Sequence, residues 1–223
     1  MRADELARRI DHTQLKPNAT IEDIRKVCDE AKKYGFYSVC VSPFYVKFAK
    51  KFLEGSDVKV ISVVGFPLGN TYTDVKVFEA KKIVENGAEE IDMVMNISAF
   101  KSGDYELVEN DIKAIVEAVK PIPVKVIIET CYLSDEEKLK ATEIAIRAGA
   151  AFVKTSTGFG PAGAKVEDIK LIKRHFGDKI KIKASGGIKD AKTAIAMIEA
   201  GADRIGASRG VQIIESLKEM QEL

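Results

Sequence analysis

The sequence lacks any strong excess of charge of one sign. Its 223 residues contain 35 Lys and Arg against 34 Asp and Glu, which gives a formal net charge of +1. A field strong enough to hold a polyanion is therefore absent, and we predict no nucleic-acid partner. No apolar run approaches the length of a membrane span, and 46% hydrophobic with 31% charged residues is typical of a globular protein, so we predict no membrane role.

Cysteine and histidine are both scarce. Cys28, Cys40 and Cys131 are an odd number, lie far apart and form no CxxC pair, which favours reduced thiols with packing roles over disulfides or zinc ligands. His12 and His175 are too few for a histidine-rich metal site and are interpreted as structural or solvent-facing. We predict neither a metal nor a cofactor.

The first ten residues lack the features of a secretory signal. Residues 1–10 alternate charged and small apolar side chains, without a hydrophobic stretch or a small-residue cleavage site. Together with the reduced thiols, this predicts a cytoplasmic location.

The sequence also lacks a linker, and we expect one catalytic domain over residues 1–223. Short β-branched runs alternate with amphipathic stretches of helical period, the pattern of repeated βα units around a parallel sheet. Strands are predicted at Ile10–Thr13, Val39–Ser42, Val60–Phe66, Ile91–Asn96, Val124–Glu129, Phe152–Ser156, Lys181–Ser185 and Arg204–Ala207. Helices are predicted at Ile21–Tyr34, Pro43–Leu53, Thr73–Asn86, Tyr105–Val119, Asp135–Ala148, Val166–Phe176, Ala191–Ala200 and Val211–Met220.

The predicted helices carry recognisable start and stop signals. Thr20 with Asp23 and Ser134 with Glu137 resemble capping boxes, in which a side-chain oxygen and a carboxylate satisfy free amides of the first turn. Three helices are followed by a glycine placed for a left-handed exit, namely Gly87, Gly149 and Gly201.

Eight βα units can close into a barrel or wind as an open, doubly wound sheet. The first βα turn lacks a GxGxxG sequence, and polar residues recur near the ends of many strands, where barrel enzymes place their chemistry. We therefore predict an α/β fold, a single-domain (β/α)8 TIM barrel with a short N-terminal lead-in.

Lys154 lies near the end of a strand that should be buried on both faces. A buried ammonium must either pair with a carboxylate or lose its proton, and the neutral amine is a nucleophile toward carbonyl carbon. For a strand lysine taken alone, the paired, structural interpretation is favoured.

A second lysine changes that balance. Lys183 lies one βα unit later, at a comparable distance from its own glycine turn. Two inward-pointing lysines on adjacent strands oppose each other's charge and lower the pKa toward neutrality, as an imine-forming lysine requires. Lys181 shares the strand parity of Lys183 but lies further from the carboxyl end of the strand, so we favour Lys183.

Carboxylates on the predicted strands are candidate proton carriers. Asp92 suits a Schiff-base lyase that must move protons, and it is explained equally well as a buried ion-pair partner of a lysine. Asp11 is a second candidate, with a helix-capping or turn role as an equal alternative. Lys125 and Glu129 share parity and are predicted to face the interior together, as supporting charges or as a simple internal ion pair.

Small residues follow the last two predicted strands, in Ser185-Gly186-Gly187-Ile188 and Gly206-Ala207-Ser208-Arg209-Gly210. They let backbone amides approach an anion at helix N-termini, and barrels commonly bind phosphate after strands seven and eight. We predict a phosphate site there, to which residues 155–158 are a candidate third wall. The stretch 160–163 is a mobile lid or simply a loop.

Taken together, these motifs resemble those of the deoxyribose-phosphate aldolase family. The matching phrases are Asp11-His12-Thr13, Glu90-Ile91-Asp92, Val126-Ile127-Ile128-Glu129-Thr130, Val153-Lys154-Thr155-Ser156-Thr157-Gly158-Phe159, Lys183-Ala184-Ser185-Gly186-Gly187-Ile188 and Gly206-Ala207-Ser208. The match spans nearly the whole chain, and the phrase that begins at Lys154 is specific in combination with the second lysine before Gly-Gly.

The resemblance implies a class I aldolase that reversibly cleaves 2-deoxy-D-ribose 5-phosphate to D-glyceraldehyde 3-phosphate and acetaldehyde, in deoxyribose phosphate catabolism. Its partners are then small-molecule sugar phosphate and aldehyde substrates, without a metal. Carried over by motif, Lys154 is the Schiff-base lysine, Lys183 the amine that lowers its pKa, and Asp92 the acid/base that works through water. Asp11 and Thr13 match positions associated with substrate and proton handling.

The remaining substrate-binding residues also follow from the resemblance. Gly186, Gly187, Gly206 and Ser208 would hold the phosphate, and Thr155 and Gly158 complete the set of residues predicted to bind substrate. Arg209 stands where some relatives have serine, so the resemblance implies no phosphate contact at this position.

Two other functions fit the same residues. One is another phosphate-binding barrel enzyme, such as a transaldolase or a sugar-phosphate isomerase, and the other is a catalytically silent protein that binds a phosphorylated ligand. Because dimers are the commonest closed assembly, we expect a homodimer or a homotetramer.

Overall fold

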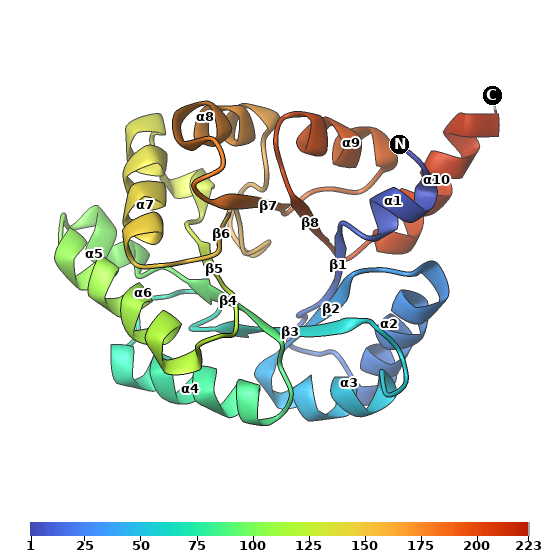
Figure 1. Cartoon of the computed structure of the whole chain (residues 1–223), viewed down its shortest axis with the longest axis horizontal. Coiled ribbons are helices and arrows are strands. Elements are labelled where there is room, and N and C mark those ends of the chain that lie inside the picture. Colours follow the sequence, from blue (N-terminus) through green and yellow to red (C-terminus); the bar gives the residue numbers. More distant parts are fainter. Residues whose placement is uncertain (223) are drawn as a thin grey trace.

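Eight parallel strands close into a barrel in the order of the sequence, with β8 paired to β1 (Figure 1). The computed structural model describes residues 1–222. Its strands are β1 (Ile10–Gln14), β2 (Ser38–Val41), β3 (Lys59–Val64), β4 (Glu90–Val94), β5 (Val124–Ile127), β6 (Phe152–Lys154), β7 (Lys181–Ser185) and β8 (Arg204–Ala207). The predicted TIM barrel is confirmed, and the open-sheet alternative is wrong.

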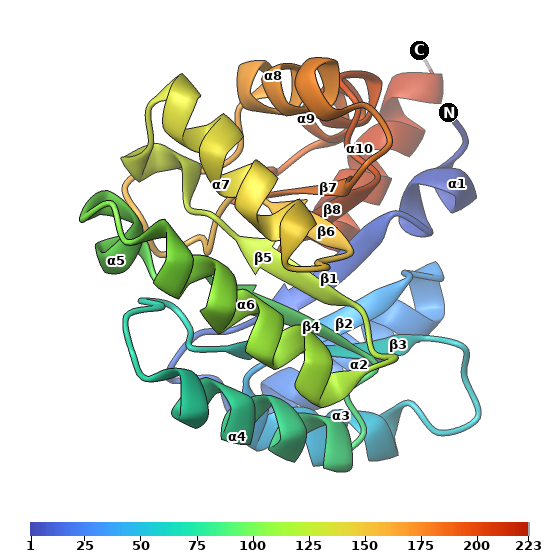
Figure 2. The same cartoon turned by 60° about the vertical axis from the view of Figure 1, so that its left-hand side comes forward.

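Helices surround the barrel and cover its outer face, as the turned view in Figure 2 shows. They are α1 (Ala3–Ala7), α2 (Ile21–Tyr34), α3 (Val46–Phe52), α4 (Thr73–Glu85), α5 (Ile97–Lys101), α6 (Tyr105–Val119), α7 (Asp135–Arg147), α8 (Val166–Phe176), α9 (Ala191–Glu199) and α10 (Gly210–Glu222), with the 3₁₀ turns η1 (Pro43–Tyr45) and η2 (Thr130–Tyr132). Within residues 1–222, each helix is too short or too polar to cross a membrane.

The main apolar core lies between the barrel and the helices. Outward-pointing strand residues such as Val39, Ile91 and Ile182 are fully buried against apolar helix residues such as Ile24 and Ile112. Parallel strands covered in this way are buried on both faces, which explains their nearly continuous β-branched sequences. The inner face of the barrel is therefore free to hold polar side chains.

Four strands end two residues earlier than predicted, and β2 ends one residue earlier. β3, β4, β5 and β6 end at Val64, Val94, Ile127 and Lys154. Hydrogen bonds between neighbouring strands continue past two of these points, since the Ile128 amide donates to the Lys154 carbonyl at 3.0 Å and the Thr155 amide to the Lys183 carbonyl at 3.1 Å. Apolar pattern alone does not mark where a barrel strand turns into its loop.

Short helices were missing from the sequence prediction. α1 lies in the expected N-terminal lead-in, α5 follows β4, and η1 separates residues 43–45 from the helix predicted at 43–53. A five-residue helix is too short to show a helical hydrophobic period. The Asn96 side chain, which accepts from the Ala99 amide at 3.1 Å, is the capping signal that marked α5.

The predicted helix signals are confirmed where the structure tests them. Thr20 with Asp23 and Ser134 with Glu137 form reciprocal capping boxes at α2 and α7. Positive φ angles of 111°, 87° and 120° occur at the three repeated glycines, Gly87, Gly149 and Gly201.

The packing role predicted for the cysteines holds for Cys28 and Cys40, which are both fully buried. Burial raises the pKa of the Cys28 thiol to about 12 and that of Cys40 to about 11, so both are protonated at neutral pH. Cys131 is a partly exposed free thiol. Cys40 lies inside the barrel with Leu15, Ile61 and Val63.

Candidate active site

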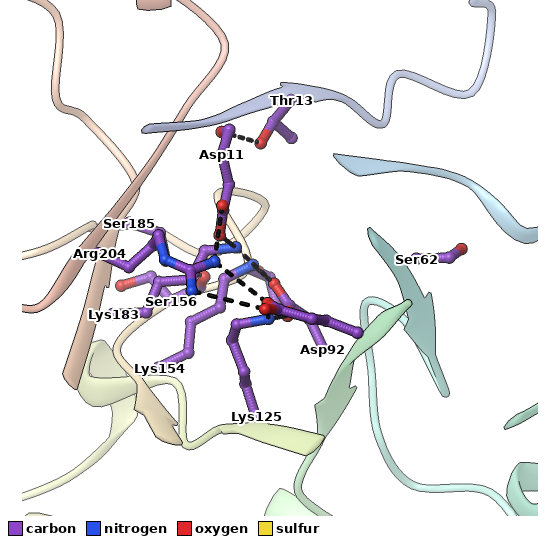
Figure 3. Close-up of polar contacts among 12 residues, drawn as sticks. Asp11, Thr13, Ser62, Asp92, Lys125, Lys154, Ser156, Lys183, Ser185 and Arg204 are labelled. Carbon is purple, nitrogen blue, oxygen red and sulfur yellow. Dashed lines mark hydrogen bonds and ion pairs between the residues drawn. The ribbon is translucent and has the colours of Figure 1, made fainter. Parts of the chain in front are cut away.

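Seven charged side chains from six strands meet inside the barrel, and we call them the interior cluster (Figure 3). Every member is less than one-tenth exposed. The members are Asp11, Glu90, Asp92, Lys125, Lys154, Lys183 and Arg204. Because neighbouring strands are in register, Lys154 lies beside Lys183, Lys183 beside Arg204, and Asp92 beside Lys125.

Lys154 and Lys183 converge on one carboxylate oxygen. The Lys154 Nζ donates to Asp92 Oδ2 at 2.8 Å, and the Lys183 Nζ donates to the same oxygen at 2.7 Å. Lys154 is the last residue of β6, so its amine lies toward the carboxyl ends of the strands, where barrel enzymes hold their substrates. The structure thus brings together the three side chains that the sequence motifs singled out.

The two lysines differ in how easily they lose a proton. Burial and the neighbouring Lys183 charge lower the pKa of Lys154, and Asp92 only partly opposes them. Burial also disfavours the charge on Lys183, but Asp11, whose Oδ2 lies 2.6 Å away, and Asp92 raise its pKa above the ordinary lysine value. The expected mutual lowering is therefore wrong for Lys183, because it contacts two carboxylates and Lys154 contacts one.

Both aspartates are ionised members of the cluster. Burial alone would raise the pKa of Asp92, but Lys125, Lys154 and Lys183 bring it well below its usual range. Burial acts in the same sense on Asp11, yet Lys183 and nearby cations lower its pKa to about 2. The alternative of a turn or capping role for Asp11 is wrong, because its side chain points into the barrel from β1.

Glu90 and Arg204 were not identified from the sequence. Arg204 Nη1 donates to Asp11 Oδ1 at 3.0 Å and to Glu90 Oε2 at 3.1 Å. Each residue begins its strand, two positions before Asp92 on β4 or Gly206 on β8. Strand parity was the available signal, because Glu90 shares parity with Asp92 and Arg204 shares parity with Gly206. Both residues lie at the amino ends of their strands, whereas the sequence prediction looked for chemistry at the carboxyl ends.

The predicted interior pairing of Lys125 with Glu129 is wrong. Lys125 forms ion pairs with Glu90 and with Asp92 Oδ1, the latter at 3.0 Å. Glu129 lies beyond β5 in a left-handed conformation, with φ of 54°, which ends the strand alternation. Its carboxylate instead accepts from the Thr157 amide at 3.1 Å and hydroxyl at 2.5 Å, and it fixes the loop that follows Lys154.

Aromatic rings close the cluster toward the amino ends of the strands. The Arg204 guanidinium lies 3.7 Å from the centroid of the Tyr37 ring and 5.2 Å from that of Phe152. The Tyr37 hydroxyl also donates to Glu90 Oε1 at 2.9 Å. Tyr37, which precedes β2, and Phe152, which begins β6, form an aromatic floor beneath the cluster.

The predicted substrate-binding residues lie at the carboxyl ends of β1, β6, β7 and β8. Thr13 is half-buried and donates to the Asp11 carbonyl at 3.0 Å. The Thr155 hydroxyl donates to the Ser185 carbonyl and accepts from the Ser185 amide and the Ser156 hydroxyl, each at 3.1 Å. All its hydrogen-bonding capacity is used, so in this structure Thr155 is part of the wall that joins β6 to β7.

The glycines predicted to hold phosphate have different surroundings. Gly187 and Ser208 are exposed. A Cβ on Gly206 would lie 2.9 Å from the Lys183 Cε, so glycine makes room for that lysine. Gly186 is approached by Gly163, whose Cα would lie 2.9 Å from a Cβ on Gly186, and the Ala164 amide donates to the Gly186 carbonyl at 3.0 Å.

The other candidate residues do not join the cluster. Lys181, the rival of Lys183, is exposed at the start of β7. His12 is buried on the outer side of β1, where its Nε2 lies 2.5 Å from Glu30 of α2, and His175 is exposed on α8. Their predicted structural and solvent-facing roles are confirmed.

The fold and the interior cluster together define a (β/α)8-barrel enzyme with a polar site at the carboxyl ends of its strands. A family model described as "DeoC/LacD family aldolase" matches residues 6–216. The chain therefore belongs to the DeoC/LacD family of aldolases.

Relatives and solved structures agree with this assignment. A deoxyribose-phosphate aldolase of Aciduliprofundum boonei is 66% identical over 220 residues, which cover 98% of this chain and 99% of the relative. The structure of "QR15, an Aldolase" has a TM-score of 0.93 at 47% identity and covers 98% of each chain. A tetrameric deoxyribose phosphate aldolase from Aeropyrum pernix has a TM-score of 0.92 at 37% identity, covering 98% of this chain and 93% of that one.

Proposed function

We propose that this chain is a class I aldolase that reversibly cleaves 2-deoxy-D-ribose 5-phosphate to D-glyceraldehyde 3-phosphate and acetaldehyde. The observation that carries the proposal is the buried Lys154 amine, which has a lowered pKa and shares one oxygen of Asp92 with Lys183. The deoxyribose-phosphate aldolase of Aciduliprofundum boonei, 66% identical, supports the choice of substrate.

The reaction begins with addition of the neutral Lys154 Nζ to the C1 carbonyl carbon of the open-chain sugar. Loss of the resulting hydroxyl as water leaves a protonated imine, and Asp92 is the carboxylate placed to accept the proton that the amine releases. Lys183, which stays charged between two carboxylates, keeps Lys154 from holding its own proton.

The protonated imine then withdraws electrons as the C2–C3 bond breaks. The C3 hydroxyl loses its proton, C3 becomes the carbonyl carbon of glyceraldehyde 3-phosphate, and the bonding pair forms an enamine on C1 and C2. Protonation at C2 followed by addition of water releases acetaldehyde and the free amine. Asp92, working through water, and Asp11 are the groups we assign to these proton transfers.

The substrate phosphate is assigned to the loops after β7 and β8. Gly186, Gly187, Gly206 and Ser208 supply small residues there, and amides at a helix N-terminus suit an anion. Thr13 on β1 and Gly158 after β6 belong to the strands that neighbour β8 and β7, and Thr155 shapes the wall that joins β6 to β7. Arg209, which is exposed beside Ser208, is available as a further cation.

We further propose one catalytic domain over residues 1–223, a cytoplasmic location, and a homodimer or homotetramer. Exposed apolar side chains before and on α4 support the assembly, since Leu68, Tyr72 and Phe78 are 70, 79 and 71% exposed. Light scattering tests the assembly directly. A monomer at micromolar concentration would contradict it.

Reductive trapping tests the function. Incubation with acetaldehyde and borohydride should attach an ethyl group to Lys154, identified by peptide mass mapping. The Lys181→Leu variant is the matched control, because it removes a strand lysine that lies outside the cluster and should leave the label in place. Absence of label on Lys154, with the protein folded, would reject the Schiff-base mechanism and favour a different barrel enzyme or a silent binding protein.

A further inference from the structure

The interior cluster contains a closed ring of alternating charges. Starting at Asp11 and returning to it, each residue forms an ion pair with the next one in the order Asp11, Arg204, Glu90, Lys125, Asp92 and Lys183. Each of the three cations bridges two carboxylates, and each carboxylate bridges two cations. The ring is complete without Lys154, which is attached to it only through Asp92 Oδ2.

Counting charges separates Lys154 from the other members. The ring holds three cations and three carboxylates, so its formal charge is zero, and a protonated Lys154 brings the cluster to +1. In a buried site an unmatched charge is costly, and the cluster returns to neutrality when Lys154 releases one proton. Adding or removing one charge at any position of the ring changes the total charge of the cluster by the same amount.

We propose that Glu90 and Arg204, neither of which contacts Lys154, are positioning residues that set the protonation of Lys154 through the net charge of the ring. The inference rests on the proposed function only in giving that protonation a chemical use. Removing the Glu90 charge leaves the cluster more positive and favours loss of the Lys154 proton. Removing the Arg204 charge leaves a surplus carboxylate and favours retention of the proton.

Other charged or titratable groups around Lys154 do not alter this count. Six of the eight strands contribute the ring and Lys154 itself. From β2, Cys40 is a thiol whose pKa burial raises to about 11, so it is neutral in the working range. From β3, the inward side chains are Ile61 and Val63, which carry no charge, and the Ser62 hydroxyl on the outer face donates to the Val41 carbonyl. Glu129, beyond β5, is bound to Thr157.

The test compares Glu90→Gln, Arg204→Met and the double variant with the unaltered protein, and uses Arg204→Lys as the control that keeps the charge. The Lys154 amine is titrated by NMR of protein carrying 13C-labelled lysine, and trapping with acetaldehyde is followed at the same pH values. Melting temperature confirms that each variant is folded. Each unit of pKa change alters the neutral fraction of Lys154 about tenfold below its pKa.

We expect the titration midpoint of Lys154 to fall in Glu90→Gln, rise in Arg204→Met, return toward the original value in the double variant and stay in place in Arg204→Lys. A merely structural role would slow trapping in both single variants without opposite midpoint shifts. Equal midpoints in all variants would overturn the proposal, and should Arg204→Met not fold, an unchanged midpoint in Glu90→Gln would do so alone. Failure of the aldolase proposal can be told apart from failure of this one. In that case acetaldehyde and borohydride leave no label on Lys154, although the Lys154 amine still titrates and still responds to the variants.

Discussion

Lys76 and Lys154 are both buried, but in different surroundings. Lys76 of α4 is fully buried outside the barrel, where its Nζ donates to Asp111 Oδ2 at 2.7 Å and to the Val94 carbonyl at 3.0 Å. Lys154 is buried inside the barrel and has one hydrogen bond, to an oxygen that also accepts from Lys183. Burial lowers the pKa of both amines.

The difference lies in the partner rather than in the depth of burial. Between α4 and α6, the Asp111 carboxylate pairs with one cation, Lys76. Its other oxygen, Oδ1, accepts from the Thr73 hydroxyl at 2.8 Å. Asp92 is divided among Lys125, Lys154 and Lys183. Lys76, with a carboxylate of its own, holds two helices together, whereas Lys154, which shares its one carboxylate partner, is the amine that we propose for the chemistry.

The largest expected effect is the loss of activity when Lys154 is replaced. Lys154→Leu should lower the rate of aldol cleavage by several orders of magnitude, because the nucleophile is removed. The fold should persist, since an apolar chain of similar length replaces the one unmatched cation of the cluster. Enzyme assay and circular dichroism check both parts, and substantial turnover in a folded variant would exclude Lys154 as the nucleophile.

The opposite pattern is expected at Lys76. Lys76→Met should lower the free energy of unfolding by about 3–5 kcal/mol, because it leaves the Asp111 charge buried without a partner. Urea unfolding measures the loss, and the titration of Lys154 should be unaffected. The control is Lys82→Met, on the exposed face of the same helix, which should cost less than about 1 kcal/mol. Equal losses in the two variants would refute the structural role of Lys76.

Acid should weaken the interior cluster in a defined range. The folded-state pKa of Asp11 is lowered to about 2, below its ordinary value, so its contribution to stability is present above about pH 4 and is lost as the pH falls toward 2. The contribution amounts to roughly 2 kcal/mol. Urea unfolding of the protein and of Asp11→Asn should converge over this range. Parallel pH profiles would contradict the assignment.

A smaller effect tests whether sharing Asp92 with Lys183 lowers the pKa of Lys154. Lys183→Leu should raise the pKa of Lys154, since Asp92 then serves one cation fewer, and imine formation should slow about tenfold for each unit of increase. The deficit should shrink as the pH is raised. An identical deficit at every pH would remove this role from Lys183.

The sequence could predict the parts of the site that obey simple strand alternation. Asp92, Lys154 and Lys183 lie on recognisable strands and point inward, as parity requires. Glu90 and Arg204 obey the same rule, but nothing local indicates that two residues 114 positions apart meet across the barrel.

Other features depended on tertiary structure. Parity failed at Glu129 because the chain leaves β5 two residues earlier and adopts a positive φ. The sequence of α4 does not indicate that Lys76 is buried, because its carboxylate partner, Asp111, belongs to another helix, α6. The fold itself was predictable because eight alternating units leave few ways to bury all their apolar faces.

The aromatic floor gives the proposed reaction an order. Because Tyr37 and Phe152 pack against Arg204 at the amino end of the cluster and Lys154 is the last residue of β6, we expect water and ligands to approach Lys154 from the carboxyl ends of the strands. The aldehyde that carries the phosphate must therefore depart before water can enter to hydrolyse the two-carbon fragment left on the lysine. While that fragment is an enamine, an incoming aldehyde competes with the proton for its C2 carbon, so bond formation is favoured when acceptor is abundant.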